Sequence, residues 1–221
     1  MLRLDTVTKI YEHRRSPVVA LDKINLHVPR QDFVAIVGPS GSGKSTLLVA
    51  LGAMQSPTSG KVFVDGKSVY ELTLQQRARF RREKIGFVFQ TFNLIPYLTA
   101  LQNVQIPLML AGAEETVQLD KATAILQRLG LGNRLDHKPT ELSVGQMQRV
   151  ALARMLANDP AVILADEPTG NLDPATCEEI MDYLVQFNNE GRTIVMVTHD
   201  PKAAKRAKRI VKLAEGRVIA D

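Results

Sequence analysis

The stretch that decides the fold is "FVAIVGPSGSGKSTLLVAL", residues 33–51. An apolar run typical of a buried strand leads into a glycine-rich loop, and apolar residues at helical spacing follow the loop. A strand, a loop of this composition and a helix form a phosphate-binding loop, in which successive backbone N–H groups point at phosphate oxygens. The sequence therefore predicts an α/β nucleotide-binding fold built around this loop.

We call residues 38–46 the phosphate loop and expect each of them to help bind the nucleotide. The glycines let the backbone curl inward, Lys44 supplies a positive charge to the β- and γ-phosphates, and Ser45 supplies an oxygen ligand to Mg²⁺. The dipole of the following helix adds to the attraction. The residues expected to bind the nucleotide are Gly38, Pro39, Ser40, Gly41, Ser42, Gly43, Lys44, Ser45 and Thr46.

Two further apolar runs, residues 162–165 and 193–198, have the composition of strands buried on both faces of a parallel sheet. Asp166 and Glu167 end the first run, and His199 ends the second. Ligands of such sheets bind beyond the carboxyl ends of the strands. We expect Asp166 to hold Mg²⁺, Glu167 to act as the general base on an attacking water, and His199 to lie near the γ-phosphate.

Two more residues are candidates for the same site. Gln90 ends the apolar run "GFVF" and could contact both Mg²⁺ and the attacking water without adding charge. Tyr11 could stack its ring on the adenine, although an ordinary aromatic residue in a strand is nearly as good an interpretation.

The rest of the chain supplies two more layers. Residues 2–11, 24–29 and 60–69 have the alternation and glycine turns of an antiparallel sheet. Residues 92–159 have helical patterns and no strand-like run, which indicates an inserted helical subdomain. We therefore expect a single domain over residues 1–221, in which 1–91 and 160–221 form the β subdomain and the core.

Composition limits the classes of function. The net charge is +5 and the pI about 9.4, with basic residues concentrated in 201–212, which we interpret as the solvated face of a surface helix rather than a nucleic-acid footprint. The one cysteine, Cys177, excludes an internal disulfide and a cysteine-based zinc cluster. The N-terminus lacks the pattern of a signal peptide and the apolar runs are too short to span a membrane, so we expect a cytosolic chain.

Residues 140–155, "TELSVGQMQRVALARM", are predicted to begin a helix. Ser143 is a good N-cap, and Met147, Val150 and Met155 repeat at helical spacing. Val144 would then lie in the first turn, where φ is negative and a valine is tolerated.

The phosphate loop, Gln90, "LSVGQMQR", "VILADEP", "GNLD" and His199, in this order, resemble the nucleotide-binding subunit of an ATP-binding cassette (ABC) transporter. The resemblance implies a RecA-like α/β core with an antiparallel β subdomain and a helical subdomain, and a head-to-tail dimer that encloses two ATP molecules. In such a dimer Ser143, Gly145 and Gln146 would reach the γ-phosphate of ATP held by the partner's phosphate loop. Asn171, Leu172 and Asp173 would cross the interface as the D-loop.

Residues 87–110 and 165–173 resemble the branch of lipoprotein-releasing, macrolide-exporting and haem-exporting transporters and the related cell-division ATPase. This implies a peripheral ATPase on the cytoplasmic face of the inner membrane that energises a separate permease. The permease is expected to touch residues 92–98, for which packing inside the helical subdomain is an equally good interpretation. Their apolar and aromatic members are Phe92, Leu94, Ile95, Pro96, Tyr97 and Leu98.

The same residues are compatible with several cargoes and with two other functions. The cargo could be haem, lipid, lipoprotein or drug, with a slight preference for haem or another amphipathic toxic molecule. A regulatory ATPase acting on cell-wall enzymes through a membrane partner would use the same residues. A nucleic-acid-associated ATPase is less favoured, because the chain has neither a coiled coil or zinc insertion nor a second cassette.

Overall fold

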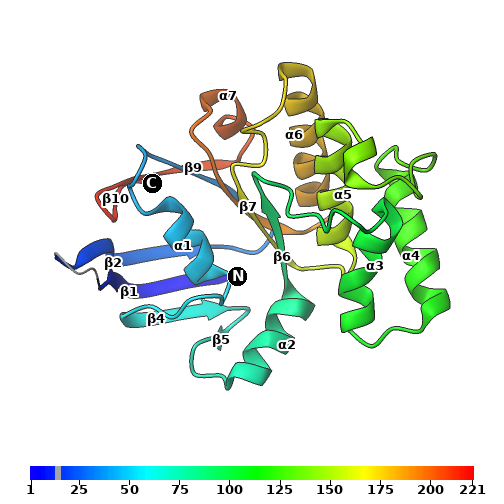
Figure 1. The fold of residues 1–221 in the computed structure, drawn as a ribbon. Coiled ribbons are helices and arrows are strands. Elements are labelled where there is room, and N and C mark those ends of the chain that lie inside the picture. Colours follow the sequence, from blue (N-terminus) through cyan, green and yellow to red (C-terminus); the bar gives the residue numbers. More distant parts are fainter. Residues whose placement is uncertain (13–15) are drawn as a thin grey trace.

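The computed structural model describes residues 1–12 and 16–221 and contains two sheets. The first is antiparallel, in the order β2-β1-β4-β5, and lies at one side of the molecule (Figure 1). Its strands are β1 (Leu2–Tyr11), β2 (Val18–Val28), β4 (Ser59–Val64) and β5 (Lys67–Ser68). The expected antiparallel layer is present, although β2 begins several residues before the predicted strand at residue 24.

The second sheet has the order β10-β9-β3-β8-β7-β6, and its strands from β9 to β6 are parallel. The three apolar runs predicted as buried strands form its adjacent central strands. Their side chains are almost entirely buried, as the absence of polar alternation indicated. The strands are β3 (Phe33–Val37), β6 (Ile85–Phe89), β7 (Val162–Asp166), β8 (Thr193–Val197), β9 (Arg209–Ala214) and β10 (Arg217–Ala220).

Helices cover both faces of the second sheet. Helix α1 (Lys44–Leu51) lies between the two sheets and contributes Leu47, Leu48 and Leu51 to the core that joins them (Figure 1). Helix α6 (Pro174–Asn189) belongs to the second core, on the other face of the sheet, and α7 (Pro201–Ala204) follows β8. The predicted α/β class is therefore confirmed.

The region 92–159 is helical, as expected, and forms one end of the molecule in Figure 1. It contains α3 (Ala100–Leu110), α4 (Glu115–Arg128), the short 3-10 helix η1 (Pro139–Glu141) and α5 (Val144–Leu156). Helix α4 stops before Gly130, whose φ of +71° a residue with a side chain rarely adopts. Among the described residues, no helix is both long and apolar enough to cross a membrane.

Two segments differ from the sequence interpretation. The surface helix expected over residues 201–212 is wrong beyond Ala204, because Arg209–Ala214 form β9 beside β3. Val211 and Leu213 are buried there while Lys212 between them is exposed, the alternation of a strand. Helix α2 (Leu74–Lys84) was not anticipated, although Thr73 and Gln76 form a capping box at its start.

Candidate functional site

The phosphate loop connects β3 to α1 and lies close to its neighbours. A Cβ atom on Gly38 would lie 2.0 Å from the carbonyl oxygen of Leu213, and one on Gly43 would lie 2.2 Å from that of Ala20. Gly43 also has a φ of +99° and is the N-cap of α1. These close approaches explain why glycine is needed at both positions.

The interior of the loop suits phosphate groups. Lys44 Nζ donates hydrogen bonds to the carbonyl oxygens of Gly38 (2.9 Å) and Pro39 (2.8 Å), so its ammonium group lies in the mouth of the loop. The Ser42 hydroxyl is buried without a hydrogen-bond partner among the described residues, and it lies beside Gly38, 2.9 Å from where a Cβ atom on that glycine would stand. The adjoining cavity of about 340 Å³ is lined by residues 18–20, 40–46, Glu167 and Val197.

The predicted metal ligands Ser45 and Asp166 lie together. Ser45 Oγ donates to Asp166 Oδ1 at 3.2 Å. Burial raises the pKa of Asp166; the hydrogen bond from Ser45 and the charge of Lys44 oppose this, while the carboxylate of Glu167 adds to it. These hard oxygens fit Mg²⁺, which would complete its shell with phosphate oxygens and water and would favour the ionised carboxylate.

Glu167 and His199, placed at the ends of neighbouring strands, form a pair. Nδ1 of His199 lies 2.9 Å from Oε1 of Glu167, and the His199 backbone N–H donates to Oε2 at 3.3 Å. Glu167 has a φ of +48°, and its own N–H donates to the carbonyl oxygen of Val197 at 2.9 Å. A non-glycine residue held in the left-handed region costs about 1–3 kcal/mol, which is typical of functional sites.

Gln90 follows β6 directly and is hydrogen-bonded to Asn171, 81 residues away in the sequence. Gln90 Nε2 donates to Asn171 Oδ1 at 3.3 Å, and Asn171 Nδ2 donates to the backbone oxygen of Gln90 at 3.1 Å. Sequence reasoning placed Asn171 only at the subunit interface, and no local pattern links it to Gln90.

Tyr11 is not among the residues that line the described cavity. Its hydroxyl donates to Gln55 Oε1 at 2.7 Å, and Lys9 Nζ lies 5.2 Å from its ring centroid. Its β-sheet neighbour Val18, with Val19, is exposed and lines the cavity. These valines offer apolar surface for the base of a nucleotide. They were not predicted, because the strand was expected to begin at residue 24 and not at Val18, beside Tyr11.

Residues 143–146, which we call the signature segment, form the start of α5. Ser143 Oγ accepts from the Gln146 N–H (3.2 Å), and Gln146 Oε1 accepts from the Ser143 N–H (2.9 Å), which confirms the predicted N-cap. Val144 is the first helical residue and 44% exposed. The signature segment does not contribute to the cavity at the phosphate loop, and Figure 1 shows α1 and α5 on opposite sides of β6 and β7.

Gly145 and Asp173 meet at Thr176 on α6. A Cβ atom on Gly145 would lie 2.7 Å from Thr176 Cγ2. Asp173 caps α6 and accepts hydrogen bonds from the N–H (3.1 Å) and hydroxyl (2.5 Å) of Thr176, which lower the pKa of its carboxyl group. The structure thus brings the signature segment and the D-loop side by side.

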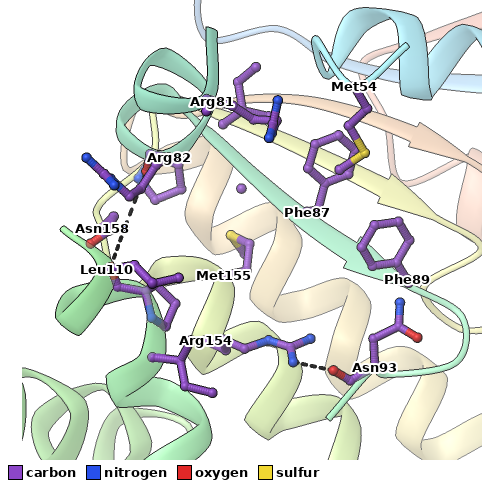
Figure 2. A pocket seen from close by; sticks show the side chains of 16 residues that line it. Met54, Arg81, Arg82, Phe87, Phe89, Asn93, Leu110, Arg154, Met155 and Asn158 are labelled. Atoms are coloured by element: carbon purple, nitrogen blue, oxygen red, sulfur yellow. Dashed lines mark hydrogen bonds between the residues drawn. The ribbon is translucent and has the colours of Figure 1, made fainter. Parts of the chain in front are cut away.

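A cavity of about 560 Å³ separates α2 and β6 from α3 and α5 (Figure 2). We call it the subdomain groove. It combines apolar side chains with three arginines, and its lining includes Met54, Arg81, Arg82, Phe87, Asn93, Leu110, Arg154 and Met155.

Arg154 holds the turn that follows Gln90. Its guanidinium donates to the carbonyl oxygens of Phe92 (2.6 Å) and Asn93, and Figure 2 shows it reaching toward Asn93. Phe92 and Asn93 both have a positive φ, of 55° and 51°. Burial lowers the pKa of Arg154, and both of its partners are neutral carbonyls.

Of the stretch expected to meet a permease, residues 92–98, Asn93 lines the groove. Leu94 packs against the core, as one of the two interpretations required. Packing inside the helical subdomain, the other interpretation of this stretch, is wrong for Pro96 and Tyr97, which are exposed, Tyr97 by 74%. They lie in the connection before α3, where backbone geometry rather than polarity decides exposure.

Comparison with known proteins agrees with this geometry. A family model described as ABC transporter matches residues 21–170. An uncharacterized ABC transporter ATP-binding protein of Thermotoga maritima is 46% identical over 99% of this chain and 93% of its own length. The macrolide export ATP-binding/permease protein MacB of Hyphomonas neptunium is 46% identical over the whole chain, which spans only 34% of that protein.

Solved structures give the same result. The dimeric structure of MJ0796, a bacterial ABC transporter cassette, has a TM-score of 0.93 and 45% identity, covering all of this chain and 97% of that one. A second dimeric structure of MJ0796, a post-hydrolysis state bound to ADP and Pi, has a TM-score of 0.93 and 44% identity over the same shares. The chain therefore belongs to the ABC transporter family, and its fold is that of the family's ATP-binding cassette.

Proposed function

We propose that this chain hydrolyses ATP as one of two identical subunits and energises a separate permease on the cytoplasmic face of a membrane. The observation that carries the proposal is the Glu167–His199 pair beside the phosphate loop, with Ser45 and Asp166 hydrogen-bonded at its edge. The bound ADP and Pi in the MJ0796 structure support ATP hydrolysis by the same fold.

In the proposed hydrolysis of ATP, the side chains around the phosphate loop have separate roles. Lys44 leaves the carbonyl oxygens of Gly38 and Pro39 to bind the β- and γ-phosphates. Glu167 accepts a proton from the attacking water, while His199 holds the carboxylate in place through its ring and backbone N–H. Mg²⁺, held by Ser45, Asp166 and Gln90, would neutralise charge that develops on the phosphates.

The second subunit would complete each site. The signature segment offers an exposed helix N-terminus with Ser143 at the cap, a favourable place for a phosphate, yet lies outside the chain's own phosphate cavity. The dimeric MJ0796 structures support a partner's ATP as its ligand. In this arrangement Ser143, Gly145 and Gln146 bind the partner's nucleotide, Asp173 fixes the D-loop, and residues 92–159 act as the subdomain that carries them.

The subdomain groove is the proposed docking place for the permease, a refinement of the expectation for residues 92–98. Its apolar side chains Met54, Phe87, Leu110 and Met155 suit one face of an amphipathic helix. Arg81 and Arg154 donate hydrogen bonds to backbone carbonyl oxygens, which carry no net charge. A carboxylate on the partner would therefore supply the opposite charge for these arginines. The fused permease in the macrolide export relative supports this type of partner.

The comparisons bear on the chemical class of the cargo. The relative named for macrolide export favours an amphipathic molecule. The narrower expectation of haem gains no support from the comparisons. A regulatory role through a membrane partner uses the same chemistry and is the alternative; it predicts copurification with a membrane protein but no cargo movement in vesicles.

A nucleic-acid role is less favoured, because both arginines among the basic residues 201–212 are paired with carboxylates of the chain. Arg206 bonds Glu178 (2.9 Å) and Asp182 (2.6 Å). Arg209 pairs with Asp221 and lies 3.6 Å from Asp32. The charges of these two arginines are therefore neutralised within the chain, which makes them less available to a phosphate backbone.

Two measurements test the proposal. Purified protein should hydrolyse ATP in the presence of Mg²⁺; no turnover above that of the Lys44→Ala variant would contradict ATPase function. For docking, Leu110→Asp should reduce copurification of the membrane partner. Met109→Asp is the matched control, because Met109 is also exposed on α3 but does not line the described groove. Equal loss in both variants would contradict docking in the groove.

A further inference from the structure

Asn171 and Gln90 are joined by two hydrogen bonds that run in opposite directions. One joins the side-chain amides, Gln90 Nε2 to Asn171 Oδ1 at 3.3 Å, and the other joins Asn171 Nδ2 to the Gln90 backbone oxygen at 3.1 Å. The pair connects the end of β6 to the D-loop.

This pairing fixes which end of the Gln90 amide is free. A backbone carbonyl oxygen can only accept, so the atom of Asn171 that faces it must be the nitrogen Nδ2. Asn171 therefore directs Oδ1, an acceptor, at the Gln90 side chain, and the Gln90 atom that donates a hydrogen bond to it must be Nε2. The oxygen Oε1 of Gln90 is left available. An amide alone could be turned either way, and the network decides its orientation.

Two contacts of Gly170, the residue just before the D-loop, strengthen this arrangement. A Cβ atom on Gly170 would lie 2.8 Å from Gln90 Nε2, so glycine lets the amide lie against the loop. The Gly170 N–H donates to the carbonyl oxygen of Glu167 at 3.1 Å. The segment that holds Gln90 is thus attached directly to the proposed general base.

We propose that Asn171 is a positioning residue, which keeps Oε1 of Gln90 directed for coordination to Mg²⁺. A hard cation binds the oxygen of an amide and not its nitrogen, so a reversed Gln90 amide would not serve as a ligand. This inference rests on the proposed function and adds a role for Asn171 within its own subunit, separate from its expected place at the dimer interface.

The test compares Asn171→Leu, which has a similar volume but no hydrogen-bonding atoms, with wild type and with Gln90→Ala. Mn²⁺ replaces Mg²⁺, and its binding in the presence of a non-hydrolysable ATP analogue is followed by electron paramagnetic resonance. Loss of an orienting partner typically weakens metal binding by about 10–100-fold, and we expect about tenfold for Asn171→Leu. Metal-free binding of the analogue should not change.

The decisive comparison is a double-mutant cycle. If Asn171 acts through Gln90, Asn171→Leu has no further effect on Mn²⁺ binding in the Gln90→Ala background. Asn133→Leu, at an exposed turn of the helical subdomain, is the control for adding a leucine to the surface. Unchanged Mn²⁺ affinity in Asn171→Leu, or equal losses in both backgrounds, would overturn the inference. Wild-type protein without ATPase activity would instead count against the proposed function.

Discussion

The phosphate loop and the signature segment are built in opposite ways. The phosphate loop is concave and formed by close backbone contacts, with Lys44 already bonded inside it and the Ser42 hydroxyl buried beside it. The signature segment is a capped helix N-terminus with an exposed valine in its first turn. We propose that both bind phosphate, but only the first has the proposed catalytic groups around it.

In the proposed function, this difference means that one chain contains two unlike halves of a site. Glu167, His199, Asp166 and Ser45 gather at the phosphate loop. The signature segment instead packs, through Gly145 and Thr176, against the start of α6. A second copy of the chain, turned head to tail, would bring each half to its complement.

The largest effect is expected at the phosphate-loop half. Glu167→Gln keeps the shape of the side chain and its contact with His199 but removes the proton acceptor, so turnover should fall at least about 100-fold. Nucleotide binding should persist, which equilibrium binding of a fluorescent ATP analogue would show. Turnover close to wild type would mean that the general base lies elsewhere.

The second largest effect concerns the far end of the signature helix, where Arg154 anchors α5 to the turn after Gln90. Arg154→Met leaves the carbonyl oxygens of Phe92 and Asn93 without their charged donor. We expect the free energy of unfolding, measured by urea denaturation, to fall by about 2 kcal/mol. Arg82→Met, at an exposed arginine of the same groove, should change it by less than about 0.5 kcal/mol. Similar losses in both variants would remove the special role of Arg154.

A smaller effect is expected at Val144, which stands in the first turn of α5. The helix begins there without a positive φ, so the valine adds an isopropyl group at the interface and no backbone strain. Val144→Gly should therefore change the ATPase rate by no more than about tenfold, or roughly 1.4 kcal/mol of barrier. A much larger gain would show that the valine restrains closure of the dimer.

The smallest effect is expected at Cys177 on α6, whose thiol lies 3.6 Å from the carbonyl oxygen of Leu172 and so reports on the D-loop. Burial, followed by the charges of Asp200 and Asp173, raises the pKa of the Cys177 thiol. A raised pKa reduces the thiolate fraction at pH 8, so iodoacetamide should react more slowly than with a short cysteine peptide and speed up as pH rises. Asp200→Asn should make the reaction faster. A rate equal to that of the peptide would show that the D-loop opens in solution.

The parts of the site that the sequence predicted are those encoded locally. A strand, a glycine loop and a helix follow one another within residues 33–51, and the Ser143 cap needs only the residues up to Gln146. Hydrogen bonds and sterics between near neighbours determine such features.

The parts that were missed depend on tertiary contacts. Gln90 and Asn171 were each expected at a site, but they are 81 residues apart and no local pattern shows that they bond to each other. Val18 and Val19 line the cavity because β2 begins next to Tyr11. In 201–212 the basic charges suggested a solvated helix, but β9 buries alternate side chains against the sheet, and pairing with β3 outweighs local propensity.

The central claim, that each site is completed by a second copy, is tested most directly by sedimentation velocity of the Glu167→Gln variant. The account predicts a monomer without nucleotide and a dimer with ATP, and a return to monomer when Ser143→Arg is added, although that double variant still binds ATP. A Glu167→Gln protein that binds ATP and stays monomeric, or a dimer that Ser143→Arg leaves intact, would contradict it.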